Sequence, residues 1–431
     1  MKRGAGLRLV IALALGAVLL AACGGGSGPS GSSSTSATGG SGGGTSVASG
    51  APIKVGFELE LSGAFAANGK QIQDGWYLGL HDFGSSVDGH KIVAKFADEQ
   101  GDPTIALNDA KRFVAQHVAL LEGPTASNAA AAVARYAGAA GMPVDDVSLC
   151  SSQQLDAYQR YGLAYASAWT CDQPSFAAAQ WAYQQGYRHV TTIGMDYSFG
   201  WQAVGTFIAA FEKAGGTIDK QIWAPISTVD FSSYVSQVPK TTNAVFALTA
   251  GADSTKLTNA WGQFGLAGKI PLFGDTTLFD QSILPSESHK AVVGLKMAAQ
   301  YCDGIDTPAN KRFAKEVHAT YGGYPGYYTD TGYIKAERLV AALKKLHGNV
   351  SNRRALADAL KSVSIQAPTG TISLSTVTDS PIQNIYICEV KDVKGALRNI
   401  PIKKYPSVQP WGTLGKSAWE SIFRRDSAGR P

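Results

Sequence analysis

The chain has 431 residues, of which 45% are hydrophobic and 16% charged, the composition of a globular protein with enough apolar residues for a sizeable core. At roughly 100 to 200 residues per domain, the length predicts two or three domains. The formal net charge of +5 is small and argues against a nucleic-acid partner. The one local basic cluster, Arg424, Arg425 and Arg430, is expected to belong to a solvated C-terminal tail, residues 411–431.

The first 22 residues have the pattern of a secretory signal peptide. Lys2, Arg3 and Arg8 give a positive start, and an apolar run follows at residues 9–20. A membrane-spanning helix needs roughly 20 apolar residues, so this run is too short to be retained as a span. Cleavage would remove the three basic residues and leave 35 basic against 33 acidic residues, a net charge of +2.

The end of this segment resembles the lipobox of bacterial lipoproteins. Leu20, Ala21 and Ala22 precede Cys23, and three glycines follow it. The resemblance implies that residues 1–22 are cut away and that Cys23 is lipidated. The mature chain would then be extracytoplasmic and lipid-anchored to the bacterial cell membrane. The alternative is an ordinary signal peptide with a chance cysteine.

Residues 24–50 consist almost wholly of Gly, Ser, Thr and Ala, with no aromatic or charged residue. Such a segment cannot bury enough apolar surface to offset its chain entropy. We therefore assign residues 23–50 as the lipidated cysteine and a flexible tether. Its end-to-end distance is roughly 30 Å in the scaling for Gly-rich chains.

From residue 52 onward, short apolar segments alternate with amphipathic segments, which is typical of an α/β fold with parallel sheets. The expected strands are residues 54–59, 91–96, 118–121, 144–149, 189–193, 244–248 and 271–273. Apolar residues at 3.6-residue spacing predict helices over residues 103–116, 204–214, 309–321 and 330–346. After a helical stretch at 356–360, strand-like segments return at 369–374 and 385–390.

Besides Cys23, the chain has four cysteines, an even set for a protein outside the cytoplasm: Cys150, Cys171, Cys302 and Cys388. Four cysteines allow three pairings. The short separation favours Cys150 with Cys171, which leaves Cys302 with Cys388. The alternative is buried free thiols that pack as small hydrophobic residues. A zinc site is disfavoured because no CxxC pair exists and the seven histidines are scattered, so no metal or other cofactor is expected.

Several short motifs follow one another between residues 52 and 401. They are LSG at 61–63, ADEQGDP at 97–103, LEGPTAS at 121–127, DYSFG at 196–200, DFSSY at 230–234 and YG at 321–322. The ordered set, together with the lipobox, resembles the type I periplasmic binding proteins of the leucine/isoleucine/valine class.

That resemblance implies two Rossmann-like α/β lobes with parallel sheets, joined by a three-crossing hinge, with the ligand held between them. Lobe 1 would comprise residues 51–168 and 303–386, and lobe 2 residues 169–302 and 387–410. The crossings would fall near residues 166–170, 298–302 and 386–390. Cys302 and Cys388 would then lie on neighbouring hinge strands, which supports their pairing as a hinge disulfide.

The family's carboxylate-binding hydroxyl positions match Ser127 and either Ser151 or Ser152, all in the first lobe. The physical reason is that a helix start presents backbone N–H groups and partial positive charge, which favour a ligand carboxylate. The alternative for each serine is a plain helix cap.

Four further positions match the family's pocket. Tyr197 matches the aromatic contact of the second lobe, and Asp275 stands where amino-acid binders place an acid to pair with the ligand ammonium. Asn68 matches a position in the first loop, and Trp169 lies at the first hinge crossing. The alternatives are a helix cap for Asp275, a turn residue for Asn68 and a packed core indole for Trp169.

The sequence departs from the branched-chain members at Ala250-Gly251-Ala252, where a bulkier aromatic lining is usual. The expected ligand class is therefore a small amino-acid-like, polar or aromatic carboxylate, or an amide. The resemblance implies a monomeric solute-binding lipoprotein that serves an ABC permease and its ATPase. The alternative is a tethered sensor that passes ligand occupancy to a signalling partner.

No catalytic set points to an enzyme. The chain has no HExxH motif, and residues 63–70 lack the spacing of a P-loop and the Ser or Thr that follows its lysine. The GxSxG match at residues 39–43 lies in low-complexity sequence without a flanking strand or helix. We therefore expect a binding protein.

Overall fold

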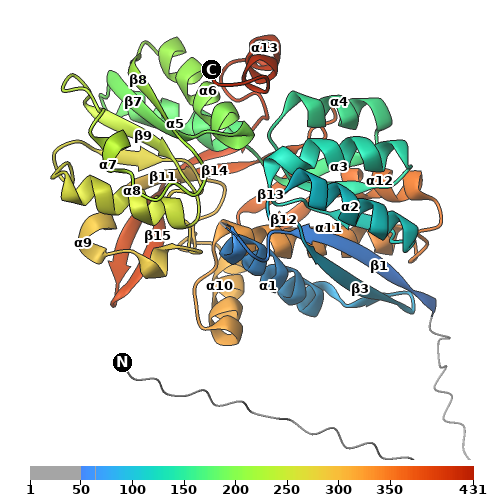
Figure 1. The fold of residues 1–431 in the computed structure, drawn as a ribbon. Helices are drawn as coiled ribbons and strands as arrows, with labels where there is room; N and C mark the ends of the chain where they lie inside the picture. The colour runs from blue at the N-terminus through green and yellow to red at the C-terminus, as the bar shows by residue number, and fades with distance from the viewer. Residues whose placement is uncertain (1–49, 64) are drawn as a thin grey trace, which may run out of the picture. The chain divides into compact units, whose positions relative to one another are not determined.

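The computed structural model describes residues 50–63 and 65–431 (Figure 1). The predicted signal peptide, Cys23 and the tether up to residue 49 lie outside the described residues. Within the described ranges, no helix is both long enough and apolar enough to cross a membrane.

Six strands form the first sheet, in the order β2-β3-β1-β4-β5-β6. They are β1 (Gly50–Leu59), β2 (Ser86–Val87), β3 (His90–Asp98), β4 (Leu120–Glu122), β5 (Val144–Leu149) and β6 (Ala164–Thr170). All neighbours pair in parallel except β2, which runs antiparallel to β3. Every residue of β4, β5 and β6 is buried, as expected for strands of a parallel sheet that is covered on both faces.

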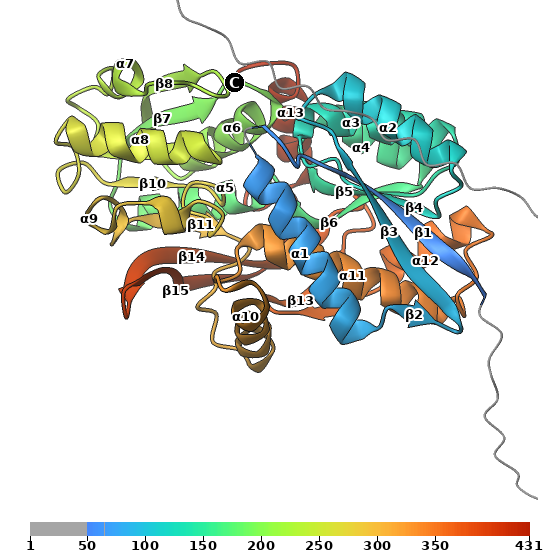
Figure 2. The same ribbon diagram turned by 60° about the horizontal axis from the view of Figure 1, so that its bottom comes forward.

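Helices cover both faces of this sheet and complete the first lobe (Figures 1 and 2). On one face lie α2 (Pro103–Ala115), α3 (Ser127–Ala139) and α4 (Ser152–Tyr161), and on the other α1 (Ala66–Phe83), α11 (Tyr327–Lys345) and α12 (Arg353–Ser362). Helices α1 and α11 pack closely because of glycine. A Cβ on Gly75 would collide with the Thr329 carbonyl, and one on Gly332 with the Ile72 carbonyl.

The second sheet has the order β12-β13-β14-β11-β10-β9-β7-β8, and β15 pairs with β14. Its parallel part is formed by β7 (His189–Met195), β8 (Thr217–Ala224), β9 (Ala244–Leu248), β10 (Leu272–Gly274) and β11 (Lys296–Ala299). The late strands pair in antiparallel fashion: β12 (Ile365–Ala367), β13 (Gly370–Leu374), β14 (Pro381–Val393) and β15 (Ala396–Val408).

The helices that follow the strands of the second sheet complete the second lobe. They are α5 (Asp172–Gln184), α6 (Ser198–Lys213), α7 (Ser232–Val235), α8 (Ala252–Gln263), the 3-10 helix η1 (Leu284–Ser286) and α9 (His289–Val292). After β11, α10 (Pro308–Tyr321) leads the chain back to α11 of the first lobe.

The chain passes between the lobes three times. The first passage leads from β6 into α5, and the second leads from β11 through α10 to α11. The third is β14 itself, because its start at Pro381 pairs with β13, which contacts α12 of the first lobe, while Tyr386 and Cys388 pair with β11. Two α/β lobes with mostly parallel sheets confirm the predicted fold class.

The C-terminal residues 411–431, whose order the sequence left open, include a helix, α13 (Lys416–Asp426). Trp419 and Phe423 are both buried, and α13 packs on α6 of the second lobe. The physical reason is visible in the sequence, since two large aromatic residues spaced four apart lie on the same face of a helix.

Candidate functional site

A small cavity lies between the two lobes, at the carboxyl ends of the strands. Ligands of open α/β sheets bind at this edge. The first lobe contributes Phe65, Thr125, Ser127, Val147, Ser148, Cys150, Trp169, Tyr327 and Tyr328, and the second lobe contributes Tyr197, Phe199 and Ala250. Six of these twelve residues are aromatic, so the cavity favours a flat, apolar ligand body.

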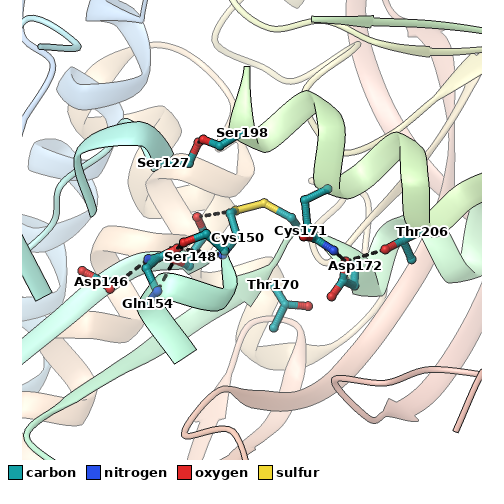
Figure 3. The surroundings of a disulfide bond; sticks show 12 residues. Ser127, Asp146, Ser148, Cys150, Gln154, Thr170, Cys171, Asp172, Ser198 and Thr206 are labelled. Atoms are coloured by element: carbon teal, nitrogen blue, oxygen red, sulfur yellow. Dashed lines mark hydrogen bonds between the residues drawn. A yellow bond between two sulfur atoms is a disulfide. The ribbon is translucent and has the colours of Figure 1, made fainter. Parts of the chain in front are cut away.

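Two helix starts meet across this cavity. Ser127 is the first residue of α3 and Ser198 the first residue of α6, and their hydroxyl oxygens lie 2.9 Å apart (Figure 3). Neither helix has a side-chain cap at its N-terminus. Helix N-termini carry partial positive charge and free N–H groups, so two of them directed at one place form a site suited to a small anion.

A buried carboxyl group lies beside this anion site. Glu99 Oε1 accepts hydrogen bonds from the backbone N–H groups of Thr125, at 2.6 Å, and Ala126, at 2.9 Å. Burial, with a smaller contribution from the nearby Glu60 carboxylate, raises the pKa of Glu99 to about 8 against the two backbone hydrogen bonds, which lower it. At neutral pH Glu99 is therefore mostly uncharged and repels a ligand carboxylate little.

The aromatic lining is held in place by ring contacts. Trp169 meets Phe199 and Tyr327 edge-on, with ring centroids 5.4 Å and 5.5 Å apart. On the other side, Phe65 of the first lobe stacks on Tyr197 of the second, at 6.5 Å. The Trp169 indole N–H is buried and has no hydrogen-bond partner among the described residues. A buried donor of this kind is suited to a polar acceptor on the ligand.

Three of the predicted ligand-binding residues line the cavity: Ser127, Trp169 and Tyr197. Ala250, where the sequence departs from the branched-chain binders, also lines it. Asn68 is buried in α1 beside the Tyr328 hydroxyl and does not itself line the cavity. The structure therefore brings together one serine and two aromatic residues of the predicted set.

Ser151 and Ser152 do not line the cavity. Ser151 is the N-cap of α4, and its Oγ accepts a hydrogen bond from the Gln154 N–H at 3.3 Å. The Ser152 N–H donates to Ser427 Oγ at 2.8 Å, just after α13. The N-terminus of α4 is thus occupied by protein groups.

Asp275 does not line the cavity either. It is buried at the end of β10, where it accepts hydrogen bonds from Ser175 Oγ at 2.7 Å and from the Thr276 N–H at 2.6 Å. Burial raises its pKa to about 7, against these hydrogen bonds. In this arrangement the carboxyl group organises the loop after β10 and is not directed at a ligand ammonium.

Sequence reasoning missed several lining residues, chiefly Phe65, Phe199, Tyr327 and Tyr328. The signal for Phe199 was present, because it belongs to the DYSFG motif that already pointed to Tyr197. The adjacent tyrosines at the start of α11 had a weaker signal. They follow Pro325 and Gly326, a pattern that indicates the start of a helix but does not show that the tyrosine side chains face the cavity.

The structure contains two disulfides, Cys150–Cys171 and Cys302–Cys388. Cys150 itself lines the cavity, and Cys171 follows β6 at the first passage between the lobes (Figure 3). Cys302 follows β11, and Cys388 lies on β14, opposite Met297 of β11. The disulfide beside the cavity is therefore the one with the short separation.

Among residues 50–63 and 65–431, no group of three or more His, Cys, Asp or Glu side chains is arranged to hold a metal ion. The carboxyl groups near the cavity instead accept hydrogen bonds from backbone N–H groups, Glu60 from that of Phe65 and Glu99 from that of Thr125. The chemistry available in the cavity is recognition by hydrogen bonds and aromatic contact.

Two α/β lobes that enclose an aromatic cavity between their strand ends define a two-lobed ligand-binding protein. The chain belongs to the periplasmic binding protein family, whose model matches residues 52–396. This confirms the resemblance to type I periplasmic binding proteins of the leucine/isoleucine/valine class. A location outside the cytoplasm follows from the family.

Individual relatives support the same family assignment. A Leu/Ile/Val-binding protein homolog 6 of Brucella melitensis is 25% identical over 351 residues, which cover 80% of this chain and 89% of the relative. A solute-binding protein of an ABC transporter from Rhodopseudomonas palustris BisB5, in complex with 3,4-dihydroxybenzoic acid, is 27% identical with a TM-score of 0.78. The match covers 83% of this chain and 98% of that one.

A second solute-binding protein, from Rhodopseudomonas palustris HaA2 in complex with p-hydroxybenzoic acid, is 25% identical with a TM-score of 0.77, and the match covers 84% of this chain and 99% of that one. The family and these structures are solute-binding proteins and not enzymes, as the sequence predicted for this chain. This chain is therefore a solute-binding protein.

Proposed function

We propose that this protein binds a small aromatic carboxylate between its lobes and delivers it to an ABC importer. The observation that carries the proposal is the meeting of the α3 and α6 N-termini, at Ser127 and Ser198, at the wall of a cavity with six aromatic residues. The helix starts suit the carboxylate and the rings suit the aromatic body. The bound ligands of the two Rhodopseudomonas proteins support this chemistry.

An amino acid fits this cavity less well than an aromatic acid. An amino-acid ligand brings an ammonium group, which needs an acidic partner on the cavity wall. Asp275, the predicted partner, is hydrogen-bonded to Ser175 and Thr276 away from the lining, and none of the twelve lining residues is acidic. A ligand with a carboxylate and no ammonium group therefore matches the residues of the cavity wall better than an amino acid does.

Binding is expected to work by closure of the lobes. A ligand that contacts Ser127 of the first lobe and Tyr197 of the second favours the closed arrangement in proportion to its higher affinity for that arrangement. We further propose that a permease with its ATPase recognises the closed form. Lipidation at Cys23 and the tether would keep a monomeric receptor close to that membrane partner.

Calorimetric titration of the purified chain with 4-hydroxybenzoate, benzoate, benzamide and leucine tests the proposal. We expect 4-hydroxybenzoate to bind. Benzamide has nearly the shape of benzoate without its charge, and we expect it to bind at least about tenfold more weakly than benzoate, since hydrogen bonds to a charged group contribute roughly 1.5 to 3 kcal/mol. Tighter binding of leucine than of either aromatic acid would contradict the proposed ligand class.

A further inference from the structure

The C-terminal helix α13 is firmly attached to the second lobe. Trp419 and Phe423 are buried, and the Trp419 indole N–H donates to Asp172 Oδ2 at 2.6 Å, at the start of α5. Asp426 packs so closely on α6 that a Cβ on Gly205 would collide with its carboxyl group. The aromatic contacts are buried, and the Asp172 carboxyl also accepts hydrogen bonds from Gln202 and Thr206 of α6, so α13 is expected to move as part of the second lobe.

The same helix also reaches the first lobe. Ser427 Oγ accepts a hydrogen bond from the Ser152 N–H at 2.8 Å, and Arg424 pairs with Asp156 at 3.0 Å. Ser152 and Asp156 both belong to α4. Figures 1 and 2 both show α13 between α6 and α4, so a segment outside the range of the family match bridges the two lobes.

The two attachments differ in strength. The contacts with α4 are one hydrogen bond and one ion pair, and the side chains of Arg424 and Asp156 are 42% and 54% exposed. Exposed ion pairs are weak and screened by salt. The contacts with α5 and α6 are buried. A change in the angle between the lobes therefore breaks the α4 contacts first and leaves the second-lobe contacts intact.

We propose that α13 is a strap between the lobes, and that Ser427 and Arg424 shift the lobe equilibrium toward the closed arrangement. The α4 contacts of α13 are present together with the Ser127–Ser198 contact across the cavity, so both belong to one arrangement of the lobes. Through the Ser152 N–H, Ser427 also binds the start of α4, close in sequence to Cys150, which lines the cavity. The strap is thus a positioning device that never touches the ligand.

The test is the interlobe distance, measured in the full lipid-anchored chain. Spin labels carried by non-canonical amino acids at the exposed positions Lys111, on α2, and Gln263, on α8, leave the four disulfide cysteines untouched. Without any ligand, the Arg424→Ala/Ser427→Ala double variant should shift the distance distribution away from that of the wild type, toward a more open form. Because no ligand is present, the outcome does not depend on the proposed ligand class.

Lys416→Ala is the control. Lys416 is an exposed cation on the same helix, and among the described residues no ion pair joins it to either lobe. It should leave the distances unchanged. If the double variant does not fold, Asp156→Ala removes the first-lobe partner of Arg424 from an exposed position and should open the lobes in the same direction.

Ligand affinity gives a second measurement. A strap that favours closure lowers the cost of reaching the binding-competent state, so its loss should weaken binding of 4-hydroxybenzoate by about three- to tenfold. Raising the salt concentration should reproduce part of this loss in the wild type and less in Arg424→Ala. The proposal is overturned if a folded double variant keeps the wild-type distance distribution, or becomes more closed.

Discussion

The hydroxyl oxygen of Ser127 lies 2.9 Å from that of Ser198, across the cleft between the two lobes. Each serine begins a helix, α3 in the first lobe and α6 in the second. One hydroxyl donates to the other, and both are placed to donate to a ligand carboxylate instead. The contact therefore marks the place where the ligand anion is expected.

Replacement of Ser127 by Ala should weaken the binding of 4-hydroxybenzoate by about tenfold, because it removes one hydrogen bond to a charged group. Calorimetric titration measures this loss. The control is Ser151→Ala, which removes the N-cap of α4 away from the cavity. It should lower the free energy of unfolding by about 1 kcal/mol and leave affinity unchanged. Equal losses of affinity in the two variants would show that the anion site is misplaced.

Asp275→Asn should leave the affinity for aromatic carboxylates unchanged, because Asp275 binds Ser175 and Thr276 and does not line the cavity. If Asp275 paired with a ligand ammonium instead, the same variant would lose most of its binding to that ligand. Titration of wild type and variant with 4-hydroxybenzoate and leucine distinguishes the two roles. A large loss of affinity for either ligand would show that Asp275 takes part in ligand binding.

The elements that could be predicted from the sequence are those whose signals are local. Residues 244–248 coincide with β9 because a run of five apolar residues is bounded by polar ones. Helix α2 begins at Pro103, as expected, since Asp102 accepts hydrogen bonds from the Thr104 and Ile105 N–H groups. For helix α3, the sequence indicated only the start at Ser127, through the family match, and did not give the range of the helix.

The site could be predicted only in part, since contacts between distant segments decide it. Ser127 and Tyr197 lie in motifs at strand ends, and the strand order brings those ends together. The role of Ser152 could not be predicted, because Ser427, 275 residues later in the chain, binds its N–H. Similarly, Phe65 lines the cavity only because it stacks on a ring of the other lobe.

The free energy of unfolding should fall as the pH rises from about 4 to 7. Burial raises the pKa of Asp275 and of Asp172 to about 7, whereas an unfolded aspartate has a pKa of about 3.9. Between these two pKa values the folded state binds more protons than the unfolded state. Each such group therefore stabilises the folded state fully below about pH 4, and this stabilisation is lost progressively until the pH exceeds about 7.

Denaturant titrations of the wild type and Asp275→Asn between pH 4 and 8 measure this dependence. A single group contributes at most about 1.4 kcal/mol per pH unit, and the variant should lose that share of the slope. Asp102, which is exposed and whose pKa is lowered by backbone hydrogen bonds, offers the control Asp102→Asn, which should not change the slope above pH 5. If Asp275→Asn kept the wild-type dependence of unfolding free energy on pH, burial would not be raising the pKa of Asp275.

The two disulfides should differ in their effect on binding. Replacing Cys150 and Cys171 by Ser opens a loop with a separation of 21 residues and should cost roughly 3 kcal/mol of unfolding free energy in the chain-entropy model. Cys302 and Cys388 have a separation of 86 residues, which corresponds to roughly 4.5 kcal/mol. Only the first pair should also weaken ligand binding, because Cys150 lines the cavity and Cys302 and Cys388 do not. Peptide mapping without reduction checks the pairing, and free thiols at these positions would contradict it.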